Sequence, residues 1–259
     1  MDKASACIFY MVGTEEKDKW DIEESLTHLY HFFNKKYQYD VVIFHENWTK
    51  DYCGRLAERY QGTTFRFVEM TPIIPEGVFK RVIGSSPGYR AMCRYMSGPI
   101  FQEELLGRYK WMWHQDADSR LMGPVNYDPF LWMEKHNKKY GFQCLMKEQD
   151  FACTGFWETT QKFIHENKVE PKSLAKHLDG NGDWNLDYYY SDFAILDMDF
   201  FRSKQYIDYF IALDEADLFF RYRVGDTLVC SMGVFLFMPE KETHQFKDIR
   251  WLHQAYVNI

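Results

Sequence analysis

The sequence predicts an α/β fold in which a mainly parallel central sheet carries helices on both faces. Short apolar runs typical of buried strands alternate with segments whose apolar residues recur every three or four positions. The 259 residues are 46% hydrophobic, which is enough to build a sizeable core. Because no low-complexity linker or internal repeat divides the chain, we expect a single domain over residues 1–259.

The first elements alternate between strand and helix. The expected strands cover residues 6–12, 39–44 and 64–68. The first helix is predicted to open at Asp21, because Ile22, Leu26 and Leu29 then lie on one face, and the second covers residues 50–60. Parallel neighbouring strands are the usual result of this order.

A long irregular crossing follows the third strand. It is marked by Pro72, Pro75, Gly77, Gly84, Pro87 and Gly88. Loops of this length are usually functional or mobile, and a helix is predicted to begin near Tyr89. Next come a strand over residues 109–114, a helix capped by Asp128 and running to about Lys138, and a strand over 140–146.

Two carboxylates follow the strand at 109–114. Asp116 and Asp118 stand where the strand gives way to a loop, and a fixed strand end can direct their oxygens at a divalent cation. Ligands in open α/β sheets bind beyond such carboxyl ends. Asp197 and Asp199 have the same spacing, but they follow the predicted strand over 193–198, and we interpret them as a strand end and helix cap.

Ordered motifs resemble glycosyltransferase family 15, the fungal α-1,2-mannosyltransferase family, from about Ala6 onward. They are YRAMCR at 89–94, SG at 97–98, WMWHQDAD at 111–118, NYD at 126–128, KYGF at 139–142, WNL at 184–186, SDF at 191–193, DFFRS at 199–203, VGD at 224–226 and His253. The resemblance implies a GT-A-type nucleotide-sugar fold. It also implies a donor half over about 1–146 and an acceptor-binding, site-closing half over about 147–259.

The resemblance implies a Mn²⁺ or Mg²⁺ site. Asp116 falls where the family has a metal-contacting glutamate, Asp118 matches a second acidic residue, and His253 matches a histidine ligand. Carboxylate and imidazole donors suit such a cation. His244 is a competing candidate, and His114 could orient a carboxylate from behind.

Side chains that donate hydrogen bonds to the nucleotide phosphates are expected on the helix that starts near Tyr89. Arg90 and Arg94 lie four residues apart on one helical face and could offer planar forks to the nucleotide. The alternative for both is a structural ion pair with Glu103, Glu104 or another acid. Tyr89 matches a family tyrosine placed near the reacting sugar.

The position of the family's candidate nucleophile is altered. Relatives have a glutamate three residues after the serine that corresponds to Ser191, and here that position is Ala194. Asp192 lies two residues earlier, a shift of roughly 6 to 7 Å along a strand, and could supply a displaced carboxylate. A front-face reaction, in which the leaving phosphate helps deprotonate the incoming hydroxyl, needs no nucleophile and is preferred.

The resemblance implies transfer of mannose from GDP-mannose to a glycan hydroxyl with retention of configuration. Tyr188, Tyr189 and Tyr190 lie among aspartates and are expected to form a sugar-binding wall, the alternative being a solvated loop. Other possible functions are transfer from another nucleotide sugar, or a catalytically silent carbohydrate-binding protein, which Ala194 favours.

Net charge and cysteine content limit the classes of binding partner and the cellular compartment that we expect. A net charge of −7 argues against a nucleic-acid partner. No apolar run approaches the roughly 20 residues of a membrane span, and no signal peptide is evident at the start. The six cysteines lack paired spacing, and Asp187 stands where fungal relatives commonly have a cysteine. We expect a cytoplasmic protein, or alternatively an excised luminal Golgi domain.

Overall fold

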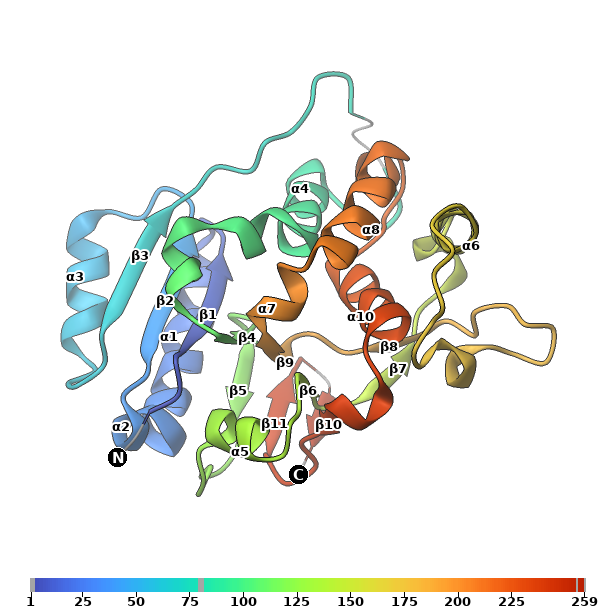
Figure 1. Cartoon of the computed structure of the whole chain (residues 1–259). Helices are drawn as coiled ribbons and strands as arrows, with labels where there is room; N and C mark the ends of the chain where they lie inside the picture. Colours follow the sequence, from blue (N-terminus) through green and yellow to red (C-terminus); the bar gives the residue numbers. More distant parts are fainter. Residues whose placement is uncertain (1–2, 79–81, 255, 259) are drawn as a thin grey trace.

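The computed structural model describes residues 3–78, 82–254 and 256–258, and a seven-stranded sheet forms its centre (Figure 1). The strand order is β10-β6-β9-β4-β1-β2-β3. The strands are β1 (Ala6–Val12), β2 (Asp40–His45), β3 (Phe65–Glu69), β4 (Trp111–Gln115), β6 (Tyr140–Phe142), β9 (Phe193–Asp197) and β10 (Thr243–Gln245). All neighbours are parallel except β9, which runs antiparallel to both β4 and β6. The predicted mainly parallel sheet is therefore confirmed.

The sheet separates two apolar layers, because alternate strand residues point to opposite faces. Ile8 and Tyr10 pack with α1, α3 and α5, whereas Cys7 and Phe9 pack in the layer that holds α4, α8 and α10. Helices on both faces agree with the prediction. The α-helices are α1 (Glu16–Leu29), α2 (Lys35–Tyr37), α3 (Lys50–Glu58), α4 (Pro87–Ser97), α5 (Pro129–Lys135), α6 (Phe156–Glu166), α7 (Met198–Phe201), α8 (Lys204–Glu215), α9 (Leu218–Arg221) and α10 (Asp226–Phe237).

Two small sheets flank the large one. The first has the order β12-β11-β5, and the second pairs β7 with β8. Their strands are β5 (Ser119–Leu121), β7 (Leu145–Lys147), β8 (Asp187–Tyr189), β11 (Trp251–His253) and β12 (Tyr256–Asn258). Short 3₁₀ helices cover 99–102, 104–108, 150–152, 174–177 and 240–242, and a π-helix covers 30–34.

Several predicted boundaries are wrong, each for a local reason. The strand expected over 140–146 is divided, because β6 pairs with β9 and β10 in the large sheet whereas β7 pairs with β8 in a separate sheet. Between them the buried Gln143 side-chain amide donates to the Ile249 carbonyl. Helix α1 begins at Glu16 rather than Asp21, because Glu15 and Asp18 form a capping box. The caps expected from Asp128 and Asp197 are confirmed.

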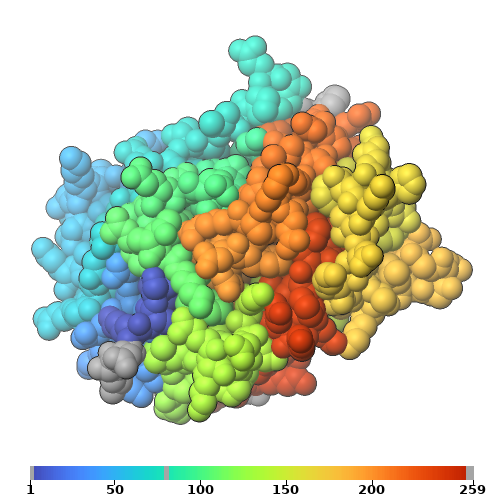
Figure 2. Space-filling model, in the orientation of Figure 1, coloured from blue at the N-terminus to red at the C-terminus, as the bar shows by residue number. Residues whose placement is uncertain are grey.

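Both parts of the chain contribute to the central sheet, since β9 and β10 lie beside strands of the first 146 residues. In Figure 2 the blue-to-cyan residues and the yellow residues lie on opposite sides of the molecule, with green and orange residues between them. All six cysteines are unpaired. Among the described helices, none combines the length and apolar character required to cross a bilayer.

Matched glycine substitutions test the packing of α10. A Cβ on Gly233 would lie 2.5 Å from the ring of Tyr206, which is fully buried and donates to the Ser97 carbonyl. We predict that Gly233→Ala lowers the free energy of unfolding, because overpacking costs about 1–3 kcal/mol against a helix-propensity gain of about 0.5–1 kcal/mol. Gly54→Ala in α3, where a Cβ meets nothing within 4 Å, should stabilise instead. Urea unfolding measures both, and stabilisation by both substitutions would contradict this packing.

Candidate active site

A tight turn after β4 places the two acidic residues. All five residues of β4 are buried, so its backbone is fixed by the sheet. The Asp116 amide donates to the Asp192 carbonyl at 3.2 Å, and the Ser119 amide donates to the Asp116 carbonyl at 3.0 Å, which closes the turn before β5 begins. Asp116 and Asp118 therefore project from a backbone anchored on both sides.

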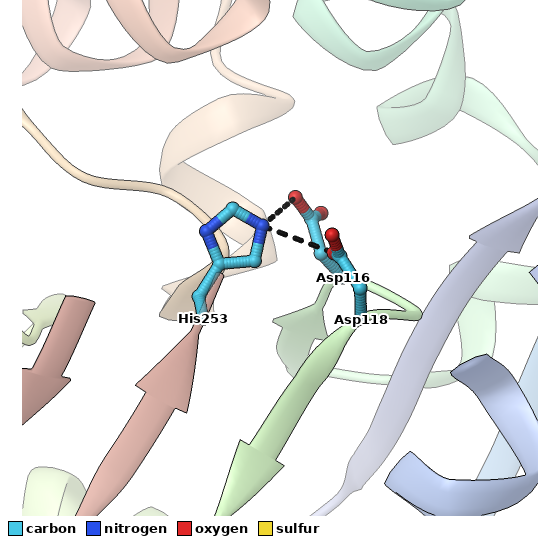
Figure 3. A group of neighbouring side chains, drawn as sticks. All are labelled: Asp116, Asp118 and His253. Carbon is cyan, nitrogen blue, oxygen red and sulfur yellow. Dashed lines mark ion pairs between the residues drawn. The ribbon is translucent and has the colours of Figure 1, made fainter. Parts of the chain in front are cut away.

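Sheet pairing brings the C-terminal histidine to this turn. Strand β11 runs antiparallel to β5, and their register sets His253 opposite Ser119. The Nε2 atom of His253 lies 3.0 Å from Asp118 Oδ1 and 3.9 Å from Asp116 Oδ2 (Figure 3). One ligand atom from each of the three residues lies within 4.8 Å of the others. The three predicted metal ligands thus converge.

Further side chains contact these candidate metal ligands and fix their orientation. The Nδ1 atom of His253 lies 2.7 Å from Asp192 Oδ2 and 2.8 Å from the Tyr190 hydroxyl oxygen. His114 Nε2 lies 3.2 Å from Asp116 Oδ1. Such outer partners fix the orientation of metal-binding side chains, and this is the role suggested above for His114.

The electrostatics of the site place a proton on the His253 imidazole, between carboxylates. Burial lowers the pKa of His253, but its contacts with Asp118 and Asp192 outweigh burial and raise that pKa to about 10. Burial raises the pKa of Asp118, but the same histidine outweighs it and holds the pKa at about 2. Burial raises the pKa of Asp192, although His253 opposes the shift. Without a cation, the imidazole therefore carries a proton between acidic groups.

This donor set fits a hard divalent cation. Two ligand atoms at about 2.0–2.1 Å from a Mg²⁺-sized ion are at most about 4.2 Å apart. The ligand atoms here lie within 4.8 Å of one another, so small rotations of the carboxylates bring all three within coordination distance. The two carboxylates suit both Mn²⁺ and Mg²⁺, and the imidazole nitrogen favours Mn²⁺ of the two, because Mg²⁺ takes oxygen ligands. The Gln254 side chain donates to Asp118 Oδ2 at 3.2 Å and steadies that carboxylate.

The three residues line a cavity of about 1050 Å³. Asp192 and Tyr89 also line it, as do Tyr188 and Tyr190, whereas Tyr189 packs in the core against Phe142. Tyr89 is placed by α4, whose N-terminal cap Ser86 accepts its amide proton. Among the described lining residues, the permanent cations are Lys17 and Arg223, and carboxylates outnumber them.

The structure does not place the two predicted phosphate-binding arginines in this cavity. Arg90 is fully buried and donates to the Phe220 carbonyl, while burial lowers its pKa. Arg94 makes two 2.6 Å bonds to Asp214. The alternative of a structural ion pair therefore holds for Arg94, with an acid more distant in sequence than Glu103 or Glu104.

The competing metal candidates lie elsewhere. Strand β9 runs antiparallel to β4, and Asp197 pairs with Trp111 at the start of β4. Asp197 therefore lies at the end of β4 opposite the acidic turn. His244 packs against Trp132, with ring centroids 4.0 Å apart and the ring planes tilted by 35°. Ala194 is buried within the sheet opposite His114, so the altered position presents no carboxylate.

Sequence reasoning missed four charged residues of the cavity. Glu46 follows β2 and could have been found by the same strand-end argument as Asp116. Lys17 and Arg223 stand in a helix and a loop, and no local pattern marks them. Asp226 lines the cavity too, and its VGD motif was the available signal.

Comparison with known proteins agrees with this geometry. The family model described as "Glycolipid 2-alpha-mannosyltransferase" matches residues 78–259. Probable mannosyltransferase KTR3 of Saccharomyces cerevisiae is 33% identical over 93% of this chain, and the chain spans 65% of its length. Alpha-1,2 mannosyltransferase KTR1 of the same yeast is 33% identical over 95% of this chain and 68% of its own length.

A solved structure shares the fold. Core-mannan synthase A (CmsA/Ktr4) from Aspergillus fumigatus, in its Mn/GDP form, superposes with a TM-score of 0.90 and 25% identity. The alignment covers 99% of this chain and 76% of that one. The expected GT-A-type fold is thereby confirmed, and the chain belongs to the glycolipid 2-alpha-mannosyltransferase family, glycosyltransferase family 15.

Proposed function

We propose that the chain is a metal-dependent retaining glycosyltransferase that transfers mannose from GDP-mannose to a hydroxyl of a glycan. The observation that carries this proposal is the convergence of Asp116, Asp118 and His253 on one point of the large cavity. Mannosyltransferase relatives and the Mn/GDP form of core-mannan synthase A support the donor and the metal.

The acidic cavity explains why a cation is needed. A diphosphate is an anion, and the described cavity lining offers it Lys17 and Arg223 among many more carboxylates. Lys17 is already paired with Asp21 at 2.5 Å. A bound Mn²⁺ would neutralise charge on the leaving diphosphate. Asp116, Asp118 and His253 would hold that ion.

The remaining site residues orient groups and supply hydrogen bonds. Asp192 and His114 fix His253 and Asp116 from behind. Tyr89 keeps its proton at neutral pH, because the nearby Cys93, burial and Asp226 raise the pKa of its hydroxyl. It is therefore a hydrogen-bond donor on the cavity wall, suited to a phosphate oxygen or to developing charge.

The positions of Asp192 and Ala194 support a front-face route. Asp192 is 3% exposed and sits at ion-pair distance from His253, so its carboxylate is already engaged. Alanine at position 194 can neither attack the sugar carbon nor stabilise a cation. The hydroxyl that attacks would then be deprotonated with help from the leaving phosphate.

A catalytically silent carbohydrate-binding protein is the second candidate function. Ala194 is the observation that favours it, since the family resemblance implies a glutamate at that position. The intact metal-ligand group favours an enzyme. Turnover separates the two functions.

Removal of one metal ligand should abolish nucleotide binding. We predict that Asp118→Ala weakens binding of GDP with Mn²⁺ more than about 100-fold, because even outer partners of metal ligands contribute 10–100-fold. Asp199→Ala removes the second acid of the other Asp-x-Asp pair and should bind normally. Calorimetry measures both, and undiminished binding by Asp118→Ala would refute the metal assignment.

Metal binding should release a proton. The raised pKa of His253 means that the free site is protonated at neutral pH, and a cation requires the neutral imidazole. Affinity for Mn²⁺ with GDP should therefore rise with pH between about 6.5 and 8.5, by up to tenfold per unit. Calorimetry in buffers of different ionisation enthalpy counts the proton. Binding without proton release would exclude His253 as a ligand.

Turnover of Asp192→Asn distinguishes the routes. If Asp192 only orients His253, the variant should lose about 10–100-fold in turnover of GDP-mannose with a mannoside acceptor. Loss of a true nucleophile costs many orders of magnitude. Mass spectrometry should find no sugar attached to Asp192, and a covalent adduct would overturn the front-face route. Complete inactivity of the unmodified protein with every nucleotide sugar tried would favour the silent function.

A further inference from the structure

The cavity extends to both sides of the Asp116–Asp118–His253 group. One end lies beyond the carboxyl ends of β1, β2 and β3 and is lined by the 11–18 segment, Glu46 and Met70. The other end is lined by Tyr188, Tyr190 and Glu148. Nucleotides in open α/β sheets bind beyond strand carboxyl ends. If the proposed function holds, the nucleoside lies at the first of these ends.

The spacing of the strands suits this placement. β4, which precedes the metal-binding turn, is separated from β2 by β1 alone. Two strand spacings amount to about 10 Å. A ribose and a base attached to a diphosphate at the metal would extend across β1 and bring the base near the residue that follows β2. That residue is Glu46.

Four carboxylates at this end differ in their partners. The Glu15 side chain accepts the Asp18 amide in the capping box of α1. Asp18 accepts the Glu15 amide at 3.0 Å and caps α1. Asp21 is paired with Lys17 and lies 3.6 Å from Arg120. Glu46 makes neither an ion pair nor a side-chain hydrogen bond with any residue in the described part of the chain. Of these four carboxylates, that of Glu46 is therefore the one available to a ligand.

The surroundings of Glu46 make an unpaired carboxylate costly. It is half-buried, and burial together with the nearby Asp18 raises the pKa of its side chain. Its position is fixed, because the preceding His45 pairs with Val12 on one side and Glu69 on the other. Met70 and Pro72 add apolar surface against which a flat base can pack. Donors from a ligand would offset the cost of this burial.

We propose that Glu46 is the residue that selects guanine, by accepting the N1–H and 2-amino protons of the base on its two carboxylate oxygens. Guanine presents two adjacent hydrogen-bond donors, N1–H and the 2-amino group, on its Watson–Crick edge. Uracil presents one N–H between two carbonyl oxygens, and cytosine and adenine each place a ring-nitrogen acceptor beside their amino group. A carboxylate is therefore matched by guanine and repelled by acceptors of the other three bases.

Calorimetry in the presence of Mn²⁺ tests this role in the whole chain, with GDP, inosine diphosphate, UDP and pyrophosphate as ligands. Inosine lacks the 2-amino group and keeps N1–H. The unmodified protein should bind GDP about tenfold or more tighter than inosine diphosphate, as expected for one hydrogen bond to a charged group. In Glu46→Gln this ratio should fall to below about threefold. Glu58→Gln, the same change at an exposed position of α3 outside the cavity, should keep the ratio.

Pyrophosphate serves as the control for folding and for the metal. Glu46→Gln should bind it with unchanged affinity, because the change is confined to the base end. Equal loss of pyrophosphate and GDP binding would show that Glu46 acts through the metal site, and an unchanged preference for GDP over inosine diphosphate would show that it does not contact the base. Either result overturns the assignment. If GDP-mannose is not the donor, the unmodified protein itself will bind UDP more tightly than GDP. That result is distinct from any effect of the Glu46 substitution.

Discussion

Pairing of β5 with β11 is the constraint on which the candidate active site depends. It joins the strand that follows the acidic turn to the C-terminal segment, and the register sets His253 opposite Ser119. A shift of one residue would turn the imidazole to the other face of that sheet. The site is therefore assembled by backbone hydrogen bonds between residues far apart in sequence, and the acidic turn alone would be an exposed pair of carboxylates.

The charges around His253 explain both the stability of this arrangement and its use. Asp118 faces one ring nitrogen and Asp192 the other, so the ring carries a proton that a divalent cation can replace. The proton and the cation serve the same electrostatic purpose, which is to compensate carboxylates held close together. The surrounding cavity is rich in acids, so an anionic nucleotide depends on that cation. Glu46, at the far end, suits a neutral base with two donors rather than a phosphate.

Much of the large sheet and part of the site could be predicted from sequence. Apolar runs gave strands at the right places, and a carboxylate pair after a buried strand indicated a metal site. The roles of Arg90 and Arg94 could not be predicted, because their helical spacing is compatible with phosphate binding and their partners lie in α9 and α8. Glu46 was overlooked although it follows a strand, because its neighbours in space come from separate loops.

A crystal of the protein grown with Mn²⁺ and GDP, measured at wavelengths on both sides of the manganese absorption edge, tests the central claim most directly. The account predicts one anomalous peak within coordination distance of Asp116, Asp118 and His253, with the diphosphate as a further ligand. A peak among Asp18, Asp21 and Glu46 instead, or GDP bound without a peak at the β5–β11 junction, would contradict it.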